Sequence, residues 1–540
     1  MKITNSTLIL MLICVTFLQT AFAEPKEDVL TPYAGPSIPG ADPSTLTGKV
    51  MTGYQGWFNC EGDGAHLGWT HWARKRDEPF GPGNITVDLW PDVSEYDDDE
   101  LYATAFTYED GTPAKTFSSH NRKTVIRHFR WMADYGIDGA FVQRFTHSLH
   151  DKTKRYHKDK VLSGAREGAN RYGRTYAVMY DLTGMPDGRL IEVFDDWRIL
   201  RSQMHITEDP AYQHHKGMPL VAIWGVGFNN KIKRRAGLEP CKALIKKFKA
   251  DGCSMMLGIA TGWRMQDRDA LQNPELHSVL LTADVLSPWS VGRFGDLPGV
   301  QRHAKKYWEQ DVVWARKHDI DYMPVVFPGF SWHNLKGAEL GSIPRLKGKF
   351  LWSQIVANKK AGADMLYIAM FDEVDEGTAI FKCTNHPPAN GESKFLTLDG
   401  LPSDFYLRLA GEAGKLLRDE IPLSTAIPES CCWKGATCQS GPWRTPPAAG
   451  SGTATAPAGR ASRAYCAWRS GRPRQNARRY CTGPENGRSS PRYGWASTHR
   501  WPPQSDGNPC LPAPADRYSG SLHKGARDNR DPPSPNRRQR

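Results

Sequence analysis

The 540-residue sequence has almost no long hydrophobic runs, and this limits what the chain can be. Its longest apolar run covers residues 8–18, whereas a membrane-spanning helix needs roughly 20 apolar residues. Lys2 precedes the run and Ala21-Phe22-Ala23 follows it, so residues 1–23 have the three parts of a cleavable signal peptide. We therefore expect a secreted or periplasmic protein that begins at Glu24 after cleavage and has no transmembrane segment.

Several catalytic signatures are also missing. No Gly-x-Ser-x-Gly stretch marks a serine nucleophile, and no cysteine of residues 24–430 stands beside a histidine as a catalytic thiol would. No Gly-rich phosphate fingerprint follows any apolar segment. These absences argue against serine hydrolases, thiol hydrolases and dinucleotide-binding folds.

The C-terminal segment lacks large aliphatic side chains, with Leu511 and Leu522 as the exceptions. Residues 431–540 hold 19 Lys and Arg against 5 Asp and Glu, whereas residues 1–430 hold 51 against 53. The net charge of +12 therefore comes from this segment, and the body gives no reason to expect nucleic-acid binding. A segment of this composition cannot bury a core. We predict that residues 426–540 are a disordered basic tail rich in Arg, Pro, Gly and Ser. It is either native or the product of a shifted reading frame, and a linker that binds an acidic polymer is the functional alternative.

Cysteine is sparse in the body, where Cys60, Cys241, Cys253 and Cys383 are the four present. An exported protein can use cysteines as disulfides. Cys241 and Cys253 bracket a predicted helix whose ends lie roughly 15 Å apart, which is too far for a bridge. Cys60 follows the first predicted strand and Cys383 the last. These strands would be neighbours in a closed barrel, so a Cys60–Cys383 disulfide is our hypothesis.

Eight short apolar segments alternate with segments of helical periodicity. Because the apolar character is continuous rather than alternating, both faces of each strand should be covered, which is typical of a parallel sheet with helices outside. The predicted strands are 49–58, 140–145, 176–181, 219–224, 254–260, 279–284, 322–327 and 365–371. The predicted helices are 120–135, 161–172, 190–204, 242–250, 265–271, 300–317, 346–360 and 404–417.

This alternation predicts an α/β fold, a (β/α)8 TIM barrel with a long loop insertion after strand one. The barrel domain should cover residues 45–425, after an N-terminal linker at residues 24–44. An open doubly wound sheet is the alternative architecture.

Four carboxylates, Asp372, Glu373, Asp375 and Glu376, follow the last predicted strand at once. The carboxyl ends of parallel strands are where reacting groups collect. Two carboxylates held close together acquire different pKa values, so one can act as an acid and its neighbour as a base. Glycoside hydrolysis requires this division. A solvated turn or helix start and a calcium site without the EF-hand pattern are the alternatives.

Aromatic and polar side chains at or near the other predicted strand ends suit a sugar, whose C–H faces stack on rings while its hydroxyls need partners. Each Trp could instead pack in the barrel, and Asp181 could cap a loop. His66 and His71 could bind a metal, but the spacing lacks a third ligand, so we predict loop residues and no metal or cofactor. The candidate substrate-binding residues are Tyr54, Trp57, Trp69, Trp72, Gln143, Arg144, Asp181, Trp224, Trp263, Trp289, Trp332, His333, Asp372 and Asp375.

The stretch Phe371-Asp-Glu-Val-Asp-Glu-Gly-Thr-Ala-Ile380 resembles the signature of glycoside hydrolase families 71 and 99. Gly53-Tyr-Gln-Gly-Trp57 and Trp69-Thr-His-Trp72 support this likeness, which covers about residues 45–418. The resemblance implies a retaining, endo-acting hydrolase of α-linked glycans, as in the endo-α-mannosidases and α-1,3-glucanases. It implies that Glu376 is the general acid. Glu373 would take the sugar's own 2-hydroxyl proton to give a 1,2-anhydro intermediate.

The sequence departs from family 99 between the two glutamates, where that family carries Trp-His and this chain has Val374-Asp375. We therefore predict an exported glycoside hydrolase acting on an oligosaccharide or polysaccharide, with the linkage left open. A carbohydrate-binding barrel without turnover is the main alternative. A metal-dependent hydrolase of another ester or phosphate is a third possibility.

Overall fold

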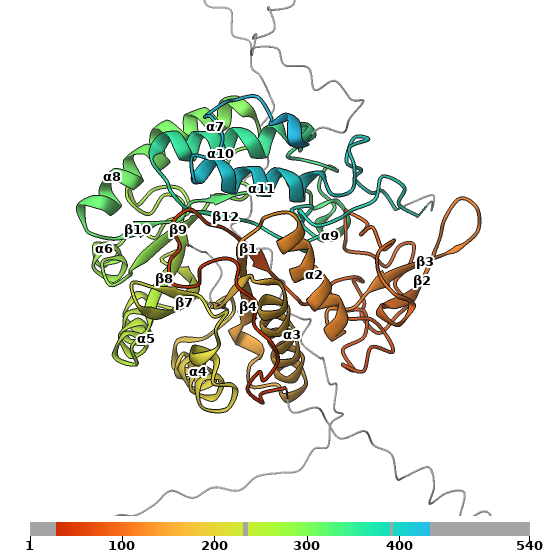
Figure 1. The fold of residues 1–540 in the computed structure, drawn as a ribbon, viewed down its shortest axis with the longest axis horizontal. Coiled ribbons are helices and arrows are strands. Elements are labelled where there is room, and N and C mark those ends of the chain that lie inside the picture. Colours follow the sequence, from red (N-terminus) through yellow and green to blue (C-terminus); the bar gives the residue numbers. More distant parts are fainter. Residues whose placement is uncertain (1–28, 230–235, 389–392, 432–540) are drawn as a thin grey trace, which may run out of the picture. The chain divides into compact units, whose positions relative to one another are not determined.

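The computed structural model describes residues 29–229, 236–388 and 393–431 (Figure 1). The predicted signal peptide and almost all of the predicted tail lie outside these residues. Among the described residues, no helix is both long enough and apolar enough to cross a membrane.

Parallel strands form the centre of the body, and their order closes into a barrel. The hydrogen-bonded order is β10-β9-β8-β7-β5-β4-β1-β12-β11. β10 and β11 are two halves of one strand, separated by Met323 and Pro324, because proline has no N–H for the ladder. β10 pairs with β9 and β11 pairs with β12, so the eight strands form a ring. The strands are β1 (Val50–Tyr54), β4 (Gly139–Phe145), β5 (Thr175–Asp181), β7 (Met218–Val226), β8 (Ser254–Ala260), β9 (Val285–Trp289), β10 (Asp321–Tyr322), β11 (Val325–Val326) and β12 (Leu366–Ile368).

Helices surround this ring (Figure 1), which confirms the predicted (β/α)8 barrel. Local signals fix several helix ends. The Asp151 side chain accepts hydrogen bonds from two backbone N–H groups at the start of α3, and α3 ends at Gly173 with φ +58°. The helices are α2 (Arg122–Asp134), α3 (Lys152–Tyr172), α4 (Ile191–Met204), α5 (Leu238–Ala250), α6 (Glu275–Leu280), α7 (Leu297–His303), a π-helical turn (Ala304–Trp308), α8 (Glu309–Lys317), α9 (His333–Lys336), α10 (Lys349–Ala361) and α11 (Phe405–Leu417).

The sixth helix and strand were predicted in the wrong place. Residues 265–271 form turns, and residues 279–284 end α6 and turn into β9 rather than forming a strand. Leu276, Val279 and Leu280 are buried because they share one face of α6. The short apolar run that predicted a strand at 279–284 therefore belongs partly to the buried face of a helix. Asp284 marks the real boundary, because its side chain accepts a hydrogen bond from the backbone N–H of Met255 at 2.8 Å.

The insertion after β1 is more than a loop. It contains an antiparallel hairpin of β2 (Leu101–Thr107) and β3 (Pro113–Phe117), joined through Asp110-Gly111, where Gly111 has φ +83°. The hairpin packs on an aromatic cluster of its own, because Phe80 stacks on Trp90 at 5.6 Å between ring centres and meets Phe106 edge to face at 5.2 Å. The prediction of a structureless insertion was therefore incomplete.

The chain before β1 packs against the amino end of the barrel. The backbone N–H of Ile38 donates to the carbonyl of Asn170, and that of Ala41 donates to the carbonyl of Gly173. Lys49 then inserts its ammonium group beneath β1, where it donates to the Gln213 side chain at 3.2 Å. From residue 29, the predicted linker is thus part of the packed body.

The hypothesis of a Cys60–Cys383 disulfide is wrong. β1 and β12 are neighbours as expected, but both cysteines are buried free thiols. Cys60 Sγ instead donates to the carbonyl of Phe117 at 3.2 Å. Cys60 therefore faces β3, whereas Cys383 pairs in an isolated bridge with Pro91 of the insertion.

This arrangement predicts the result of thiol labelling. We expect Cys60 and Cys383 to react with iodoacetamide in denaturant without any reductant, as Cys241 and Cys253 should in the same digest. Peptide mass spectrometry measures the modification at each site. A peptide pair joined through Cys60 and Cys383, released only by reductant, would contradict the structure.

Candidate active site

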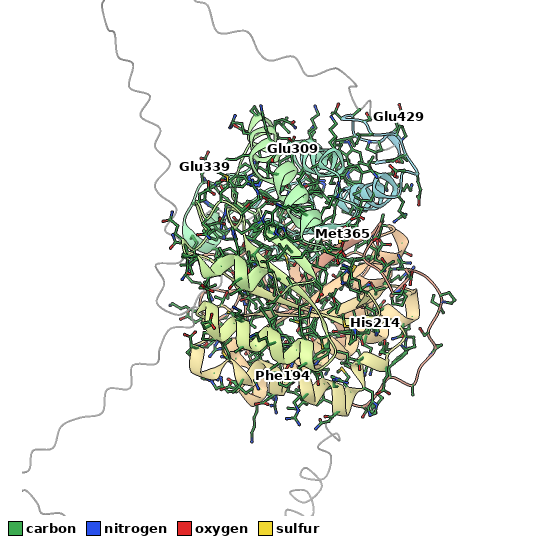
Figure 2. All side chains as sticks on the ribbon, turned by 90° about the vertical axis from the view of Figure 1, so that its left-hand side faces the viewer. Phe194, His214, Glu309, Glu339, Met365 and Glu429 are labelled. Atoms are coloured by element: carbon green, nitrogen blue, oxygen red, sulfur yellow. The ribbon has the colours of Figure 1, made fainter. Side chains whose placement is uncertain are left out.

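The loop after β12 buries all four predicted acids. Asp372, Glu373, Asp375 and Glu376 are each 3% exposed or less, and Met365, just before β12, is also buried within the body (Figure 2). A solvated turn, one of the alternatives, does not fit this burial. A buried carboxylate must be neutralised or hydrogen-bonded, because leaving it charged and unpaired costs several kcal/mol or more.

Asp372 ties the end of β12 to the end of β1. Its two carboxylate oxygens accept the backbone N–H groups of Gln55 at 2.8 Å and Gly56 at 2.9 Å. Burial raises the pKa of Asp372 to about 7 against the effect of these two donors. With both oxygens occupied by backbone, Asp372 positions the loop; its predicted contact with substrate has no observed support.

Glu373 is held by a donor on each carboxylate oxygen. Gln55 Nε2 donates to Oε1 at 2.7 Å and Thr378 Oγ1 donates to Oε2 at 2.8 Å. Burial raises the pKa of Glu373 well above its ordinary value, the charge of Asp375 adds to this, and the two donors oppose it. The side chain is therefore fixed in direction, and its charged form is favoured by two hydrogen bonds.

Glu376 stands one turn further along the same loop. Its backbone carbonyl accepts the N–H of Ser331 at 2.8 Å, which joins the loop to the segment before α9. Burial raises the pKa of Glu376 well above its ordinary value, and the charges of Glu373 and Asp375 raise it further. The Trp332 indole and the charge of Lys336 lower it. The charge of Glu373 thus makes Glu376 harder to ionise, as expected for a base beside an acid.

Asp375 pairs with a histidine from the insertion. Its Oδ2 lies 3.0 Å from His71 Nδ1, and the His71 ring stacks on Trp57 with 3.7 Å between ring centres. Burial raises the pKa of Asp375 to about 8, helped by the charge of Asp88. Burial lowers the pKa of His71 to about 3, helped by Lys158. At neutral pH the pair therefore carries one shared proton and no net charge.

Asp88 of the insertion holds two of the rim loops together. Its carboxylate accepts the backbone N–H groups of His333 at 2.7 Å and Asn334 at 2.8 Å, at the start of α9. Its own N–H donates to the carbonyl of Val374 at 3.0 Å, inside the acid loop. The insertion is thus a frame that sets the position of the acids.

A second group of predicted residues gathers around Tyr367 of β12. Gln143 Nε2 lies 3.1 Å from the Tyr367 hydroxyl, and Trp289 lies 6.3 Å from its ring, edge to face. Trp224 packs edge to face on Trp289 at 5.6 Å. Nearby strand ends carry Asp181, whose Oδ1 accepts the N–H of Thr183 at 2.7 Å.

Other predicted residues lie among packed side chains. Tyr54 hydrogen-bonds to His128 of α2 at 2.8 Å, and Trp263 packs on Trp314 of α8 at 4.8 Å. Trp69 and Trp72 pack on Phe80 inside the insertion. These positions indicate packing roles, in line with the alternative considered for each Trp.

Arg144 faces away from the barrel interior. It is fully buried and forms ion pairs with Asp196 at 2.6 Å and Asp159 at 2.9 Å, on α4 and α3. Its neighbour Gln143 points inward, because successive side chains of a strand face opposite sides. Arg144 therefore joins β4 to two helices, which is a structural role rather than the substrate contact predicted for it.

Reasoning from sequence missed several residues of the site. Gln55 directly follows β1 and Thr378 directly follows the acids in the motif, so their positions in the sequence indicated both residues. The role of Asp88 had no such signal, because it caps a helix that begins 245 residues later. His71 was considered for a metal, but among the described residues the sole cluster of three candidate ligand atoms is Asp97, Asp99 and Glu100, elsewhere in the insertion.

No family model matches the chain, and no curated protein matches it. Among solved structures, it is similar to the GH99 endo-alpha-mannosidase of Bacteroides thetaiotaomicron, with 17% identity, a TM-score of 0.49, and coverage of 69% of this chain and 99% of that one. It is also similar to a glycoside hydrolase-like protein (13% identity, TM-score 0.43, 72% and 98% covered). A third similar structure is GH5_18 from Streptomyces cattleya in complex with GlcNAc, with 12% identity, a TM-score of 0.36, and coverage of 56% of this chain and 76% of that one. At these identities, function must be argued from the chain's own residues.

The raised pKa of Asp375 predicts a pH-dependent stability difference for Asp375→Asn. The folded protein holds this proton up to about pH 8, whereas the ordinary pKa is 3.8. Asp375 alone should therefore lower the unfolding free energy as pH rises from about 4 to about 8, by up to about 1.4 kcal/mol per pH unit. In wild type the lowered pKa of His71 opposes this loss below about pH 6.5, so the net loss is expected above that pH. The stability of the variant relative to wild type should rise across this window in denaturant unfolding curves. Asp134→Asn, at an exposed ion pair, is the control. A relative stability that falls with pH would mean that Asp375 is ionised against a protonated His71.

The Arg144 ion pairs predict a large loss of stability on substitution. Arg144→Met leaves two buried carboxylates without their cation, which costs about 3–5 kcal/mol of unfolding free energy. Arg130→Met, which breaks an exposed pair with Asp134, should cost less than about 1 kcal/mol. Chemical denaturation followed by tryptophan fluorescence measures both. Equal effects of the two substitutions would contradict a structural role for Arg144.

Proposed function

We propose that the chain is an exported glycoside hydrolase that cleaves α-linked glycans, with Glu376 as general acid and Glu373 as base. The observation that carries the proposal is the buried acid loop at the carboxyl end of β12, where burial raises the pKa of both glutamates and the charge of Glu373 raises that of Glu376 further. The resemblance of this loop to the family 71 and 99 signature agrees with it. Export rests on the predicted signal peptide.

The hydrogen bonds decide which glutamate holds the proton. Two carboxylates in a dry site cannot both ionise cheaply, so they share a proton. Gln55 and Thr378 donate to both oxygens of Glu373 and favour its charged form. The shared proton therefore resides on Glu376, which becomes the acid, and Glu373 becomes the base.

The proposed reaction has two steps and retains the anomeric configuration. Glu373 takes the proton of the sugar 2-hydroxyl, and the 2-oxygen attacks C1 while Glu376 gives its proton to the leaving oxygen. A 1,2-anhydro sugar forms. Glu376 then takes a proton from water, the water oxygen attacks C1, and Glu373 returns its proton to the 2-oxygen. Both carboxyl groups end as they began.

Aromatic side chains beside the acids would bind the sugar. His71 and Trp289, which are both partly exposed, offer rings for C–H groups, and they pack on Trp57 and Trp224 behind them. Gln143 and Asp181 offer hydrogen-bonding groups. His71 and Trp332 are partly exposed beside the buried acids. We infer that a sugar reaches Glu373 and Glu376 by displacing one of these two side chains.

A carbohydrate-binding barrel without turnover is the second candidate. The almost complete burial of Glu373 and Glu376, 3% and 2% exposed, favours it, because a reacting sugar must contact both. The two candidates make the same prediction for binding and opposite predictions for hydrolysis.

Substitution of each glutamate separates their roles. Glu373→Gln and Glu376→Gln should each lower kcat on an α-linked oligosaccharide by roughly 10²–10⁴-fold, the range for general acid–base groups, with binding retained. On an aryl glycoside with a good leaving group, Glu376→Gln should recover the first step, seen as a burst of released aryl alcohol, because that group leaves without protonation. Steady turnover should stay slow, because Glu376 also takes the proton from water in the second step. Glu373→Gln should remain slow on both substrates.

The matched control is Glu309→Gln on α8, an exposed glutamate (Figure 2), which should leave kcat unchanged. Steady-state kinetics and calorimetric binding provide the two measurements. Hydrolysis that persists at the wild-type rate in Glu376→Gln would refute the assigned acid. Sensitivity to a chelator would favour the metal-dependent alternative.

A further inference from the structure

A separate cavity of about 350 Å³ lies where the loops after β8 and β9 meet the start of α7 and its π-helical continuation. This volume is within the range of small-molecule sites. Its charged lining is unbalanced, since four cations face it together with the single carboxylate of Asp296. The cations are Arg268, Arg293, Arg302 and Lys306.

Three of these cations form ion pairs. Arg302 Nη2 lies 3.7 Å from Asp296, the carboxylate that lines the cavity, and the other two cations are held from behind. Arg293 Nε lies 2.7 Å from Asp269, and Lys306 Nζ lies 2.8 Å from Asp267. Neither carboxylate lines the cavity. The partners therefore stand behind the cations and leave the cavity side of each one available.

Arg268 is positioned without a carboxylate. No ion pair involves it among the described residues, and its Nη2 donates to the carbonyl of Arg293 at 2.8 Å. Its guanidinium lies 5.8 Å from the centre of the Tyr307 ring. A guanidinium fixed by a carbonyl and a ring keeps its remaining donors for a ligand.

His303 adds a buried polar atom to the same cavity. It is 3% exposed, its Nε2 lies 3.4 Å from Thr261 Oγ1, and its Nδ1 has no hydrogen-bond partner in the described part of the chain. Burial, followed by the charges of Arg268, Arg293 and Lys306, lowers its pKa to about 3. The neutral ring can therefore accept from Thr261 at Nε2, and it forms part of the cavity wall without adding a charge.

The helix itself is irregular at this point. The π-helical turn Ala304–Trp308 separates α7 from α8 and carries Lys306 and Tyr307, both of which line the cavity. Single π turns inside α-helices occur often at functional sites.

From these observations we propose that Arg268, Arg293, Arg302, Lys306 and His303 form a binding site for an oxyanion group, a phosphate, sulfate or carboxylate. Planar guanidinium groups bind such groups through paired hydrogen bonds. The ligand is either a free anion or the acidic group of a glycan. β8, β9 and β12 are parallel, so the cavity and the acid loop lie at the same end of the barrel, with β9 two strand positions from β12. Only the glycan source rests on the proposed function.

Calorimetric titration of the full chain with inorganic phosphate, and then with inorganic sulfate, tests the site. We expect saturable binding to one site and a dissociation constant about ten-fold higher in Arg268→Gln, the loss of a charge-assisted hydrogen bond. Arg302→Gln should also weaken binding, and its side chain is 73% exposed, so folding should be unaffected. Lys75→Gln, an exposed cation of the insertion outside this cavity, should bind as wild type does. No saturable binding, or equal weakening by Lys75→Gln, would overturn the proposal.

The source of the oxyanion follows from a second titration with a uronate-bearing oligosaccharide and its neutral counterpart. Tighter binding of the acidic sugar that inorganic phosphate competes away assigns the site to a glycan. Equal binding of the two sugars, with phosphate binding retained, assigns it to a free anion. Tighter binding of the acidic sugar that Arg268→Gln leaves unchanged would contradict the site. None of these measurements requires hydrolysis, so a failure of the proposed hydrolase activity would not affect them.

Discussion

The burial of four carboxylates in one five-residue loop is the constraint on which the rest of the site depends. Such a loop is unstable unless each acid is neutralised or hydrogen-bonded. Asp372 uses backbone donors of β1, Glu373 uses Gln55 and Thr378, and Asp375 uses His71. Of the two glutamates, Glu376 has fewer donors that favour its charged form, so it is the one that keeps its proton. The same hydrogen bonds that stabilise the buried loop therefore give the two glutamates different roles.

The insertion after β1 is what makes this burial possible. Its Asp88 fixes the start of α9 and the carbonyl of Val374, and its His71 supplies the partner of Asp375. The hairpin and its aromatic cluster give the insertion a core of its own. In a TIM barrel the loops at the carboxyl end set the chemistry, and here the longest of these loops encloses the acids.

Much of the barrel could be predicted from sequence because its strands are continuous apolar runs. The exception, β9, was misplaced because Val279 and Leu280 form an apolar run that serves a helix face, which periodicity over so short a segment cannot distinguish. The hairpin was missed although Asp110-Gly111 is a strong turn signal. Within the site, the four acids could be predicted as functional residues because they directly follow the last strand. Arg144 could have been assigned to the helix side from the alternation of β4, whereas Asp88 could not, since its partners are set by tertiary packing alone.

The most direct test of the central claim is to incubate the full chain, shown to be folded, with α-linked polysaccharides and high-mannose glycans and to measure released oligosaccharides by mass spectrometry. The account predicts release of oligosaccharides whose new reducing end first appears in the α configuration by proton NMR. Silence across the panel, from protein that binds one of these glycans, would contradict hydrolysis and assign the barrel to carbohydrate binding.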